Sequence, residues 1–232
     1  MNNEILRGLL PLAGWNEDRL DDLMITGGSD PILPTSFRIG DTSTAALSAV
    51  GLAVSDLWES KTGRKQRVSV DARRATASLR SGKYMQMDGA GVSTERNMVM
   101  GTYPTKDGRW SYLHCNFPNH RAAALSVLGV NEDRDEVTKA VAKWDAFDLE
   151  EAIIEARGAG GMVRSMEEWA IHPQAAAIAS LPLMDIVKIA DSPPEPLPDG
   201  SRPLSGVRVL DLTRVLAGPT CARPVSYTHL RA

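Results

Sequence analysis

Residues 203–223 read PLSGVRVLDLTRVLAGPTCAR, and they contain the clearest strand, loop and helix signal in the chain. The run from Val207 to Leu212 is short, mostly apolar and rich in β-branched residues, which is typical of a strand buried in a parallel sheet. Gly218 and Pro219 then suit a tight turn and the first position of a helix. This succession predicts an α/β fold with a doubly wound sheet, in which ligands bind at the carboxyl ends of the strands.

The composition excludes several classes of protein. Of the 232 residues, 43% are hydrophobic and 24% are charged, as in an ordinary globular protein. The net charge of −3 argues against nucleic-acid binding, because no basic face dominates. Cys115 and Cys221 match no metal-ligand spacing, so we expect a reducing, cytoplasmic setting. Residues 1–15 make a poor signal peptide, and no apolar run approaches the ~20 residues of a membrane span, so no membrane association is expected.

A long helix is predicted at about 42–59, opened by Asp41. Its apolar residues are too numerous for a narrow stripe, so we expect the helix to be largely buried. Lys61 and Gly63 suit its C-terminal end, where a cation complements the helix dipole and glycine adopts the left-handed cap.

Further elements follow this helix. The sequence RVSV at 67–70 predicts a brief strand, and Asp71 would cap a helix that runs to about Met87. An Asp-Gly turn at 107–108 indicates a hairpin whose second strand is 110–115. Other elements are expected as a helix at 16–24, a helix at 117–128, a helix capped by Asn131, a helix at 147–157, a helix at 166–171 opened by a capping box of Ser165 and Glu168, and a strand at 184–189.

Three stretches resemble the class III coenzyme A-transferases, the CaiB/BaiF family. The run P-L-S-G-V-R-V-L-D-L-T-R-V-L-A-G-P at 203–219 is similar to the N-terminal signature of that family. The run I-G-D-T-S-T at 39–44, followed by K-T-G-R-K-Q-R-V-S-V at 61–70, resembles the segment around its catalytic aspartate, with Lys65 where the family commonly has glycine. The hairpin, the helices and M-V-R-S-M-E-E-W at 162–169 are similar to its small domain.

The resemblance implies a partial class III CoA-transferase fold, with Rossmann-like large-domain fragments and a small α+β domain. The signature that opens a simple family member comes last here, so we interpret the chain as part of a fusion of two family-like units. The regions expected are 1–97, the C-terminal part of a first large-domain unit; 98–190, the small α+β domain; 191–202, a proline-rich linker; 203–223, the start of a second unit; and 224–232, a non-native tail in which Pro224 breaks the helix.

The resemblance assigns catalysis to Asp41. In the family this carboxylate attacks an acyl-CoA thioester to form a mixed anhydride, and the released CoA thiolate converts the anhydride into an enzyme–CoA thioester that passes CoA to an acceptor acid. Backbone donors at the helix N-terminus would stabilise the developing oxyanions. The partners implied are acyl-CoA and a small carboxylic acid, with no tightly bound cofactor. The alternative is that Asp41 only caps its helix.

The resemblance also suggests a CoA-binding loop, made of Arg214, Val215, Leu216 and Ala217. Arg214 would meet a phosphate and the other three would line the adenosine pocket; the alternative is an ordinary loop with a solvated arginine. Residues 88–91 are a short, weak counterpart of the glycine loop of the family. We expect no metal, because the adjacent residues His114 and Cys115 would point to opposite faces of a strand.

Two other functions stay open. The same fold hosts acyl-CoA racemases, which transfer a proton at the α-carbon. A non-enzymatic alternative is that residues 1–190 form a degenerate scaffolding unit of a fused enzyme. The family forms interlocked dimers, so we expect either a homodimer or the intramolecular pairing of two fused units. By itself, the present chain is expected to be inactive.

Overall fold

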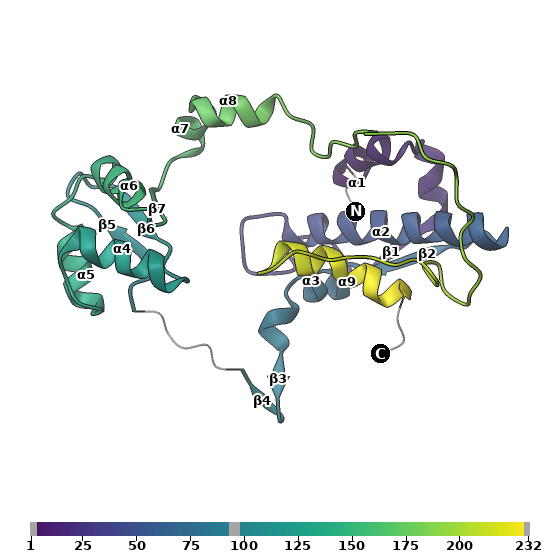
Figure 1. Ribbon diagram of the computed structural model, residues 1–232, viewed down its shortest axis with the longest axis horizontal. Helices are drawn as coiled ribbons and strands as arrows, with labels where there is room; N and C mark the ends of the chain where they lie inside the picture. The colour runs from purple at the N-terminus through teal and green to yellow at the C-terminus, as the bar shows by residue number, and fades with distance from the viewer. Residues whose placement is uncertain (1–3, 93–97, 230–232) are drawn as a thin grey trace. The chain divides into compact units, whose positions relative to one another are not determined.

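The computed structural model describes residues 4–92 and 98–229 (Figure 1). The chain divides into two units: residues 1–92 with 186–232 form unit 1, and residues 93–185 form unit 2. None of the helices in the described residues is long and apolar enough to cross a membrane.

Unit 1 is built on a two-stranded parallel sheet. Strand β1 (Leu23–Thr26) pairs with β2 (Val68–Asp71), and Leu23 lies opposite Val68. Strand β1 was missed, because a helix was predicted at 16–24, where only a 3₁₀ turn precedes the strand. The other elements of the unit are helices α1 (Glu4–Leu9), α2 (Ile39–Thr62), α3 (Ala72–Leu79) and α9 (Ala217–His229), 3₁₀ turns at Leu10–Ala13, Glu17–Asp22 and Ser81–Tyr84, and the hairpin of β3 (Gln86–Met87) and β4 (Ala90–Gly91).

Helix α2 confirms the prediction of a long helix but corrects the expected burial. It spans 24 residues, and its buried positions are small or polar except for Leu52. Gly51 shows why this face is small: a Cβ there would lie 2.6 Å from Cγ1 of Val68 on β2. The larger apolar side chains occupy the other side of the helix, where Val50 is 37% exposed. The helix therefore packs through a face of small residues and leaves an apolar face only partly covered.

The predicted caps of unit 1 are present. Gly63 has φ of +69° and donates its N–H to the carbonyl of Glu59 over 2.7 Å, which ends α2. The Asp71 carboxylate accepts the N–H of Arg74 at 2.9 Å and opens α3. Helix α3 stops at Leu79 instead of Met87, because residues 81–84 tighten into a 3₁₀ turn and the chain then enters β3.

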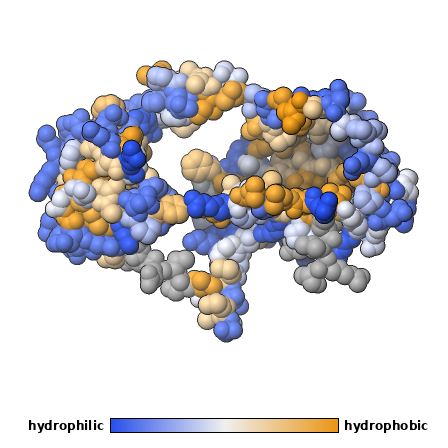
Figure 2. Space-filling model, viewed as in Figure 1, coloured by the Kyte–Doolittle hydropathy of each residue, from blue (hydrophilic) through white to orange (hydrophobic). Residues whose placement is uncertain are grey.

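Two predicted strands do not form. Residues 184–189 and the run 207–212 adopt no regular secondary structure. A strand requires a neighbour that shares its backbone hydrogen bonds, and the parallel sheet of unit 1 contains only β1 and β2 among the described residues. Leu210 and Leu212 are accordingly more than 80% exposed. In Figure 2, hydrophobic surface runs along the side of unit 1 that carries α9.

The end of unit 1 lies over α2 and α3. Lys61 of α2 donates from Nζ to the carbonyls of Arg202 and Ser205, at 3.1 and 3.3 Å. Arg223 of α9 donates to the carbonyl and the hydroxyl of Ser78 at 2.9 and 2.8 Å. Helix α9 continues through Pro224, so the predicted break there is wrong. The proline removes one backbone hydrogen bond of the helix.

Unit 2 joins a three-stranded antiparallel sheet to helices. Strands β5 (Gly101–Pro104), β6 (Trp110–Leu113) and β7 (Gly160–Met162) lie in that order. Tyr103 is buried in the core, and its hydroxyl donates to the carbonyl of Val99 at 2.6 Å. The helices of the unit are α4 (Pro118–Leu128), α5 (Arg134–Val141), α6 (Ala146–Glu155), α7 (Met166–Ala170) and α8 (Pro173–Ala179).

The helix starts of unit 2 test the capping predictions. The capping box of Ser165 and Glu168 is confirmed. Asn131 does not cap α5; Asp133 does, by accepting the N–H groups of Asp135 and Glu136 at 2.9 Å each. Both candidates have short polar side chains, so residue type alone did not distinguish them.

Candidate active site

Asp41 lies in the first turn of α2. Its side chain is 10% exposed. One of its carboxylate oxygens, Oδ2, accepts hydrogen bonds from Nε and Nη2 of Arg38, both at 3.1 Å. The Arg38 guanidinium also lies 3.6 Å from the carboxylate of Glu4 on α1. The hydrogen bond to Asp41 is the main cause that raises the pKa of Arg38.

Asp41 does not cap its helix; Asp30 does. The N-cap position of α2 is Arg38, whose side chain makes no capping bond. The Asp30 carboxylate instead accepts the N–H of Gly40 at 2.9 Å and the N–H of Asp41 at 2.8 Å. It also accepts the N–H of Ile32 at 3.2 Å. The backbone donors expected to stabilise oxyanions at this turn are therefore occupied by Asp30.

The position of the Asp30 carboxylate requires glycine at position 40. A Cβ on Gly40 would lie 2.4 Å from Oδ1 of Asp30 and 2.7 Å from Cδ1 of Ile32. Burial alone would raise the pKa of Asp30, but the backbone hydrogen bonds from Asp41, Ile32 and Gly40 and the charge of Arg38 outweigh it and hold that pKa below its ordinary value. Asp30 thus sits at the start of α2 as an anion.

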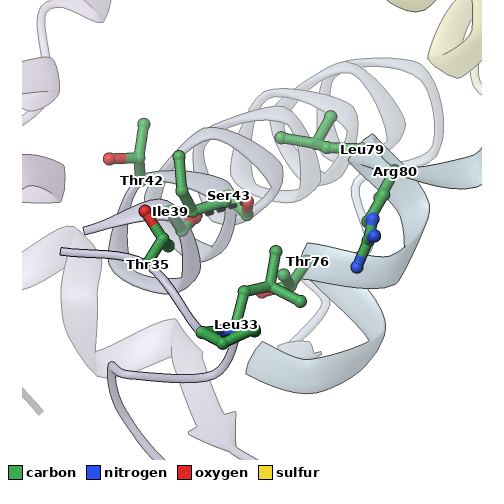
Figure 3. A pocket seen from close by; sticks show the side chains of 9 residues that line it. Leu33, Thr35, Ile39, Thr42, Ser43, Thr76, Leu79 and Arg80 are labelled. Atoms are coloured by element: carbon green, nitrogen blue, oxygen red, sulfur yellow. Dashed lines mark hydrogen bonds between the residues drawn. The ribbon is translucent and has the colours of Figure 1, made fainter. Parts of the chain in front are cut away.

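A cavity of about 570 Å³ borders the same turn of α2, on another side of the helix (Figure 3). Successive residues of an α-helix lie about 100° apart around its axis, so Asp41 is about 200° from Ile39 and from Ser43, which both line the cavity. Asp41 is not among the lining residues, which are Leu33, Pro34, Thr35, Ile39, Thr42, Ser43, Thr76, Leu79 and Arg80. The cavity and the Asp41 carboxylate therefore lie on different faces of α2.

The predicted CoA-binding loop lies beside a later part of α2 than the turn that carries Asp41. Residues 214–217 are exposed, and Val215 has φ of +75°. Leu216 and Ala217 line a second, apolar cavity of about 670 Å³ together with residues of α2 between Ala46 and Leu57. The strand that was expected to present this loop is absent, so the structure does not bring the loop and Asp41 into one pocket.

The remaining candidate sites have simple structures. Residues 86–91 form a tight exposed hairpin, with Asp88 and Gly89 at positive φ, rather than an open glycine loop. Within residues 4–92 and 98–229, no group of three or more His, Cys, Asp or Glu side chains is placed to hold a metal ion. His114 packs against Tyr112, with the ring centroids 6.0 Å apart.

Sequence reasoning missed Asp30 and Arg38. An Asp-Pro dipeptide favours a turn whose aspartate bonds nearby backbone N–H groups, and Asp30–Pro31 carries that signal. The signal predicts a local turn, however, and not that the carboxylate reaches the start of a helix ten residues later. Arg38 stands three residues before Asp41, which is a spacing that allows contact in the first helical turn.

Comparison with known proteins identifies the class. Residues 23–194 match the model of CoA-transferase family III, and the chain belongs to that family. It is 26% identical over 244 residues to the "Acetyl-coenzyme A transferase nodX" of Hypoxylon pulicicidum, which covers 86% of this chain and 41% of that protein. It is 29% identical over 133 residues to an "Acyl-CoA transferase" of Gibberella moniliformis, which covers 50% of this chain and 23% of that protein. The chain thus spans less than half the length of either relative.

The solved structures agree on the fold. The Rv3272 structure from M. tuberculosis matches with a TM-score of 0.53 at 14% identity, which covers 66% of this chain and 48% of that one. At such a low sequence identity the match shows a similar fold and nothing about function. The α/β class and the family expected from the sequence are confirmed.

Proposed function

We propose that this chain is part of an enzyme that transfers coenzyme A from an acyl-CoA to a small carboxylic acid, with Asp41 as the nucleophile. The family and the two relatives named as CoA or acyl-CoA transferases support CoA transfer as the reaction. The position of Asp41 at the start of α2 supports its role.

One observation carries the assignment of Asp41. A carboxylate in the first turn of a helix is ordinarily explained by capping, but here Asp30 accepts the backbone N–H groups of Gly40 and Asp41. The Asp41 carboxylate is left facing Arg38, with a side chain that is 10% exposed. Helix capping does not account for this carboxylate, which supports the proposal that it takes part in the reaction.

The proposed reaction has four steps. An oxygen of the Asp41 carboxylate attacks the thioester carbonyl, and the C–S bond breaks to give a mixed anhydride and the CoA thiolate. The thiolate attacks Cγ of Asp41, forms an aspartyl–CoA thioester and releases the first acid as a carboxylate. The acceptor carboxylate attacks the same Cγ, which expels the thiolate and forms a second anhydride. The thiolate then attacks the acyl carbonyl of the acceptor, giving the new acyl-CoA and free Asp41.

Arg38 fits the electrostatic needs of these steps. Each attack places negative charge on a tetrahedral oxygen, and a cation near that oxygen lowers the barrier. The Arg38 side chain is 46% exposed and already bonds Oδ2 of Asp41. When the carboxylate becomes an acyl derivative and loses its charge, the guanidinium is available to the oxyanion. We therefore assign Arg38 as the nearest charged group that stabilises the intermediates.

CoA is itself the substrate, so no tightly bound cofactor is needed. Arg214, Val215, Leu216 and Ala217 are our candidates for contact with CoA, in an assembly that gives residues 207–212 a strand partner. That assembly would be a homodimer or a pair of fused units, in a reducing cytoplasm, and we propose that the 232-residue chain alone does not turn over.

A scaffolding role for residues 1–190 is the second candidate. It is favoured by one observation, that the cavity at the first turn of α2 lies on another face than Asp41. In that case Asp41 would be dispensable for turnover.

Replacement of Asp41 separates the two candidates. The complete protein encoded by the gene, with the 232-residue chain alongside, is assayed for CoA transfer as wild type, Asp41→Ala and Asp41→Asn. Glu59→Gln is the matched control, because it removes a carboxylate from the opposite end of the same helix. We expect the rate of CoA transfer to fall about a thousandfold or more in both Asp41 variants, as for a removed nucleophile. Glu59→Gln should keep the wild-type rate. Retained transfer in Asp41→Ala would assign residues 1–190 to scaffolding.

A further inference from the structure

The start of α2 holds two carboxylates that compete for the same donors. The first N–H groups of any helix lack partners within the helix, and a carboxylate in the first turn is attracted to them. Asp41 stands in that first turn, since α2 begins at Ile39. Its own backbone, left uncapped, would draw its side chain away from Arg38.

Asp30 removes that competition. It accepts the N–H groups of Gly40 and Asp41 at 2.9 and 2.8 Å, and it anchors itself through the N–H of Ile32 at 3.2 Å. Because these donors are taken, the Asp41 carboxylate bonds outward to Nε and Nη2 of Arg38.

Gly40 provides an independent observation of the same arrangement. A Cβ at this position would overlap Oδ1 of Asp30, at 2.4 Å, so only glycine admits the carboxylate. Gly40 is buried and is not at positive φ. Alanine would therefore suit the helix at this position better than glycine, and the contact with Asp30 is what requires glycine.

We infer that Asp30 is a positioning residue: its carboxylate, seated on Gly40, occupies the backbone donors of α2 and so keeps the Asp41 carboxylate available to the acyl group. This inference rests on the proposed function, because it names what orients the nucleophile. The charged groups around the turn are Arg38, which precedes the helix, and Glu4 on α1. The ionised state of Asp30, which its three backbone bonds favour, agrees with this role.

The test compares two ways of removing the contact between the Asp30 carboxylate and Gly40. Asp30→Ala removes the carboxylate, whereas Gly40→Ala keeps every charge and blocks the contact. Asp133→Ala is the matched control, because Asp133 also caps a helix through two backbone N–H groups, but in unit 2. The complete protein is assayed for kcat and KM, and amide hydrogen exchange at Gly40 and Asp41 is measured in the 232-residue chain, where no turnover is needed.

We expect kcat to fall by about a hundredfold in Asp30→Ala and in Gly40→Ala, as for a misplaced reacting group, with KM changed by less than about threefold. The double variant should be no worse than either single variant, because both remove one contact. Asp30→Asn, whose amide retains one acceptor, should lie between Asp30→Ala and wild type. The amides of Gly40 and Asp41 should exchange faster in both alanine variants. Their exchange should be unchanged in Asp133→Ala.

A kcat in Asp30→Ala equal to that of Asp133→Ala would overturn the inference. So would unchanged exchange at Gly40 and Asp41, or additive losses in the double variant. These outcomes are distinct from failure of the proposed function, which is read from retained transfer in Asp41→Ala and leaves the exchange measurements untouched.

Discussion

Helix α2 and the run at 207–212 are both rich in apolar residues, yet α2 is a helix of 24 residues and the run has no regular structure. A helix satisfies its backbone hydrogen bonds within its own segment. A strand borrows them from a neighbour, and the described sheet of unit 1 offers only β1 and β2. The helix that carries Asp41 therefore forms from its own segment, whereas the strand that would present residues 214–217 requires a partner strand.

The largest effect that tests this comparison comes from one leucine in each region. Leu52 of α2 is fully buried, whereas Leu212 is 85% exposed. Leu52→Ala should lower the free energy of unfolding of unit 1 by about 2–5 kcal/mol, because it leaves a cavity. Leu212→Ala should change it by less than about 0.5 kcal/mol.

Urea unfolding, followed by amide exchange in α2 so that unit 1 is read separately from unit 2, measures both values. Equal losses in the two variants would show that the run at 207–212 is packed as firmly as α2, and the contrast between the regions would fail.

A smaller effect is expected at the β5–β6 hairpin, where a strand does find its neighbour. The turn brings the N–H of Thr105 to the carbonyl of Arg109 at 3.0 Å. Asp107 fixes this turn by accepting the Thr105 hydroxyl at 2.6 Å and the N–H of Ala146 on α6 at 3.1 Å. Asp107→Ala should lower the melting temperature of unit 2 by less than Leu52→Ala lowers that of unit 1, because the turn is exposed.

The same residue predicts a dependence on pH. The hydrogen bond from Thr105 is the main cause that lowers the pKa of Asp107 from its ordinary value of 3.8. A carboxyl with a lowered pKa in the folded state stabilises the fold above its ordinary pKa, and that contribution is lost as the pH falls below about 4. Between neutral pH and pH ~3, the melting temperature should therefore fall less in Asp107→Ala than in wild type. Parallel curves would contradict the assignment.

The sequence was sufficient for elements whose causes are local. The cap at Gly63, the capping box at Ser165 and the long helix after Asp41 follow from a few neighbouring residues, and each is present. The prediction of a strand at 207–212 was wrong, because apolar, β-branched residues form a strand only where a partner strand exists. Strand β1 was missed for the converse reason, since its partner β2 lies more than forty residues later.

The candidate site divides in the same way. Asp41 was found from a local motif, and the structure places it at the start of α2 as expected. Asp30 was missed because its role depends on a contact across ten residues, which no periodicity records. The Gly-Asp pair at 40–41 held the clue, since a buried glycine inside a helical turn indicates a close approach.

The most direct test of the account is to locate the covalent intermediate. The complete protein is incubated with an acyl-CoA, quenched and digested with trypsin, which releases residues 39–61 as one peptide with three carboxyl side chains, those of Asp41, Asp56 and Glu59. We predict that mass spectrometry finds coenzyme A joined as a thioester to Asp41. An adduct on Asp56 or Glu59, or on another peptide with this one unmodified, would contradict the account.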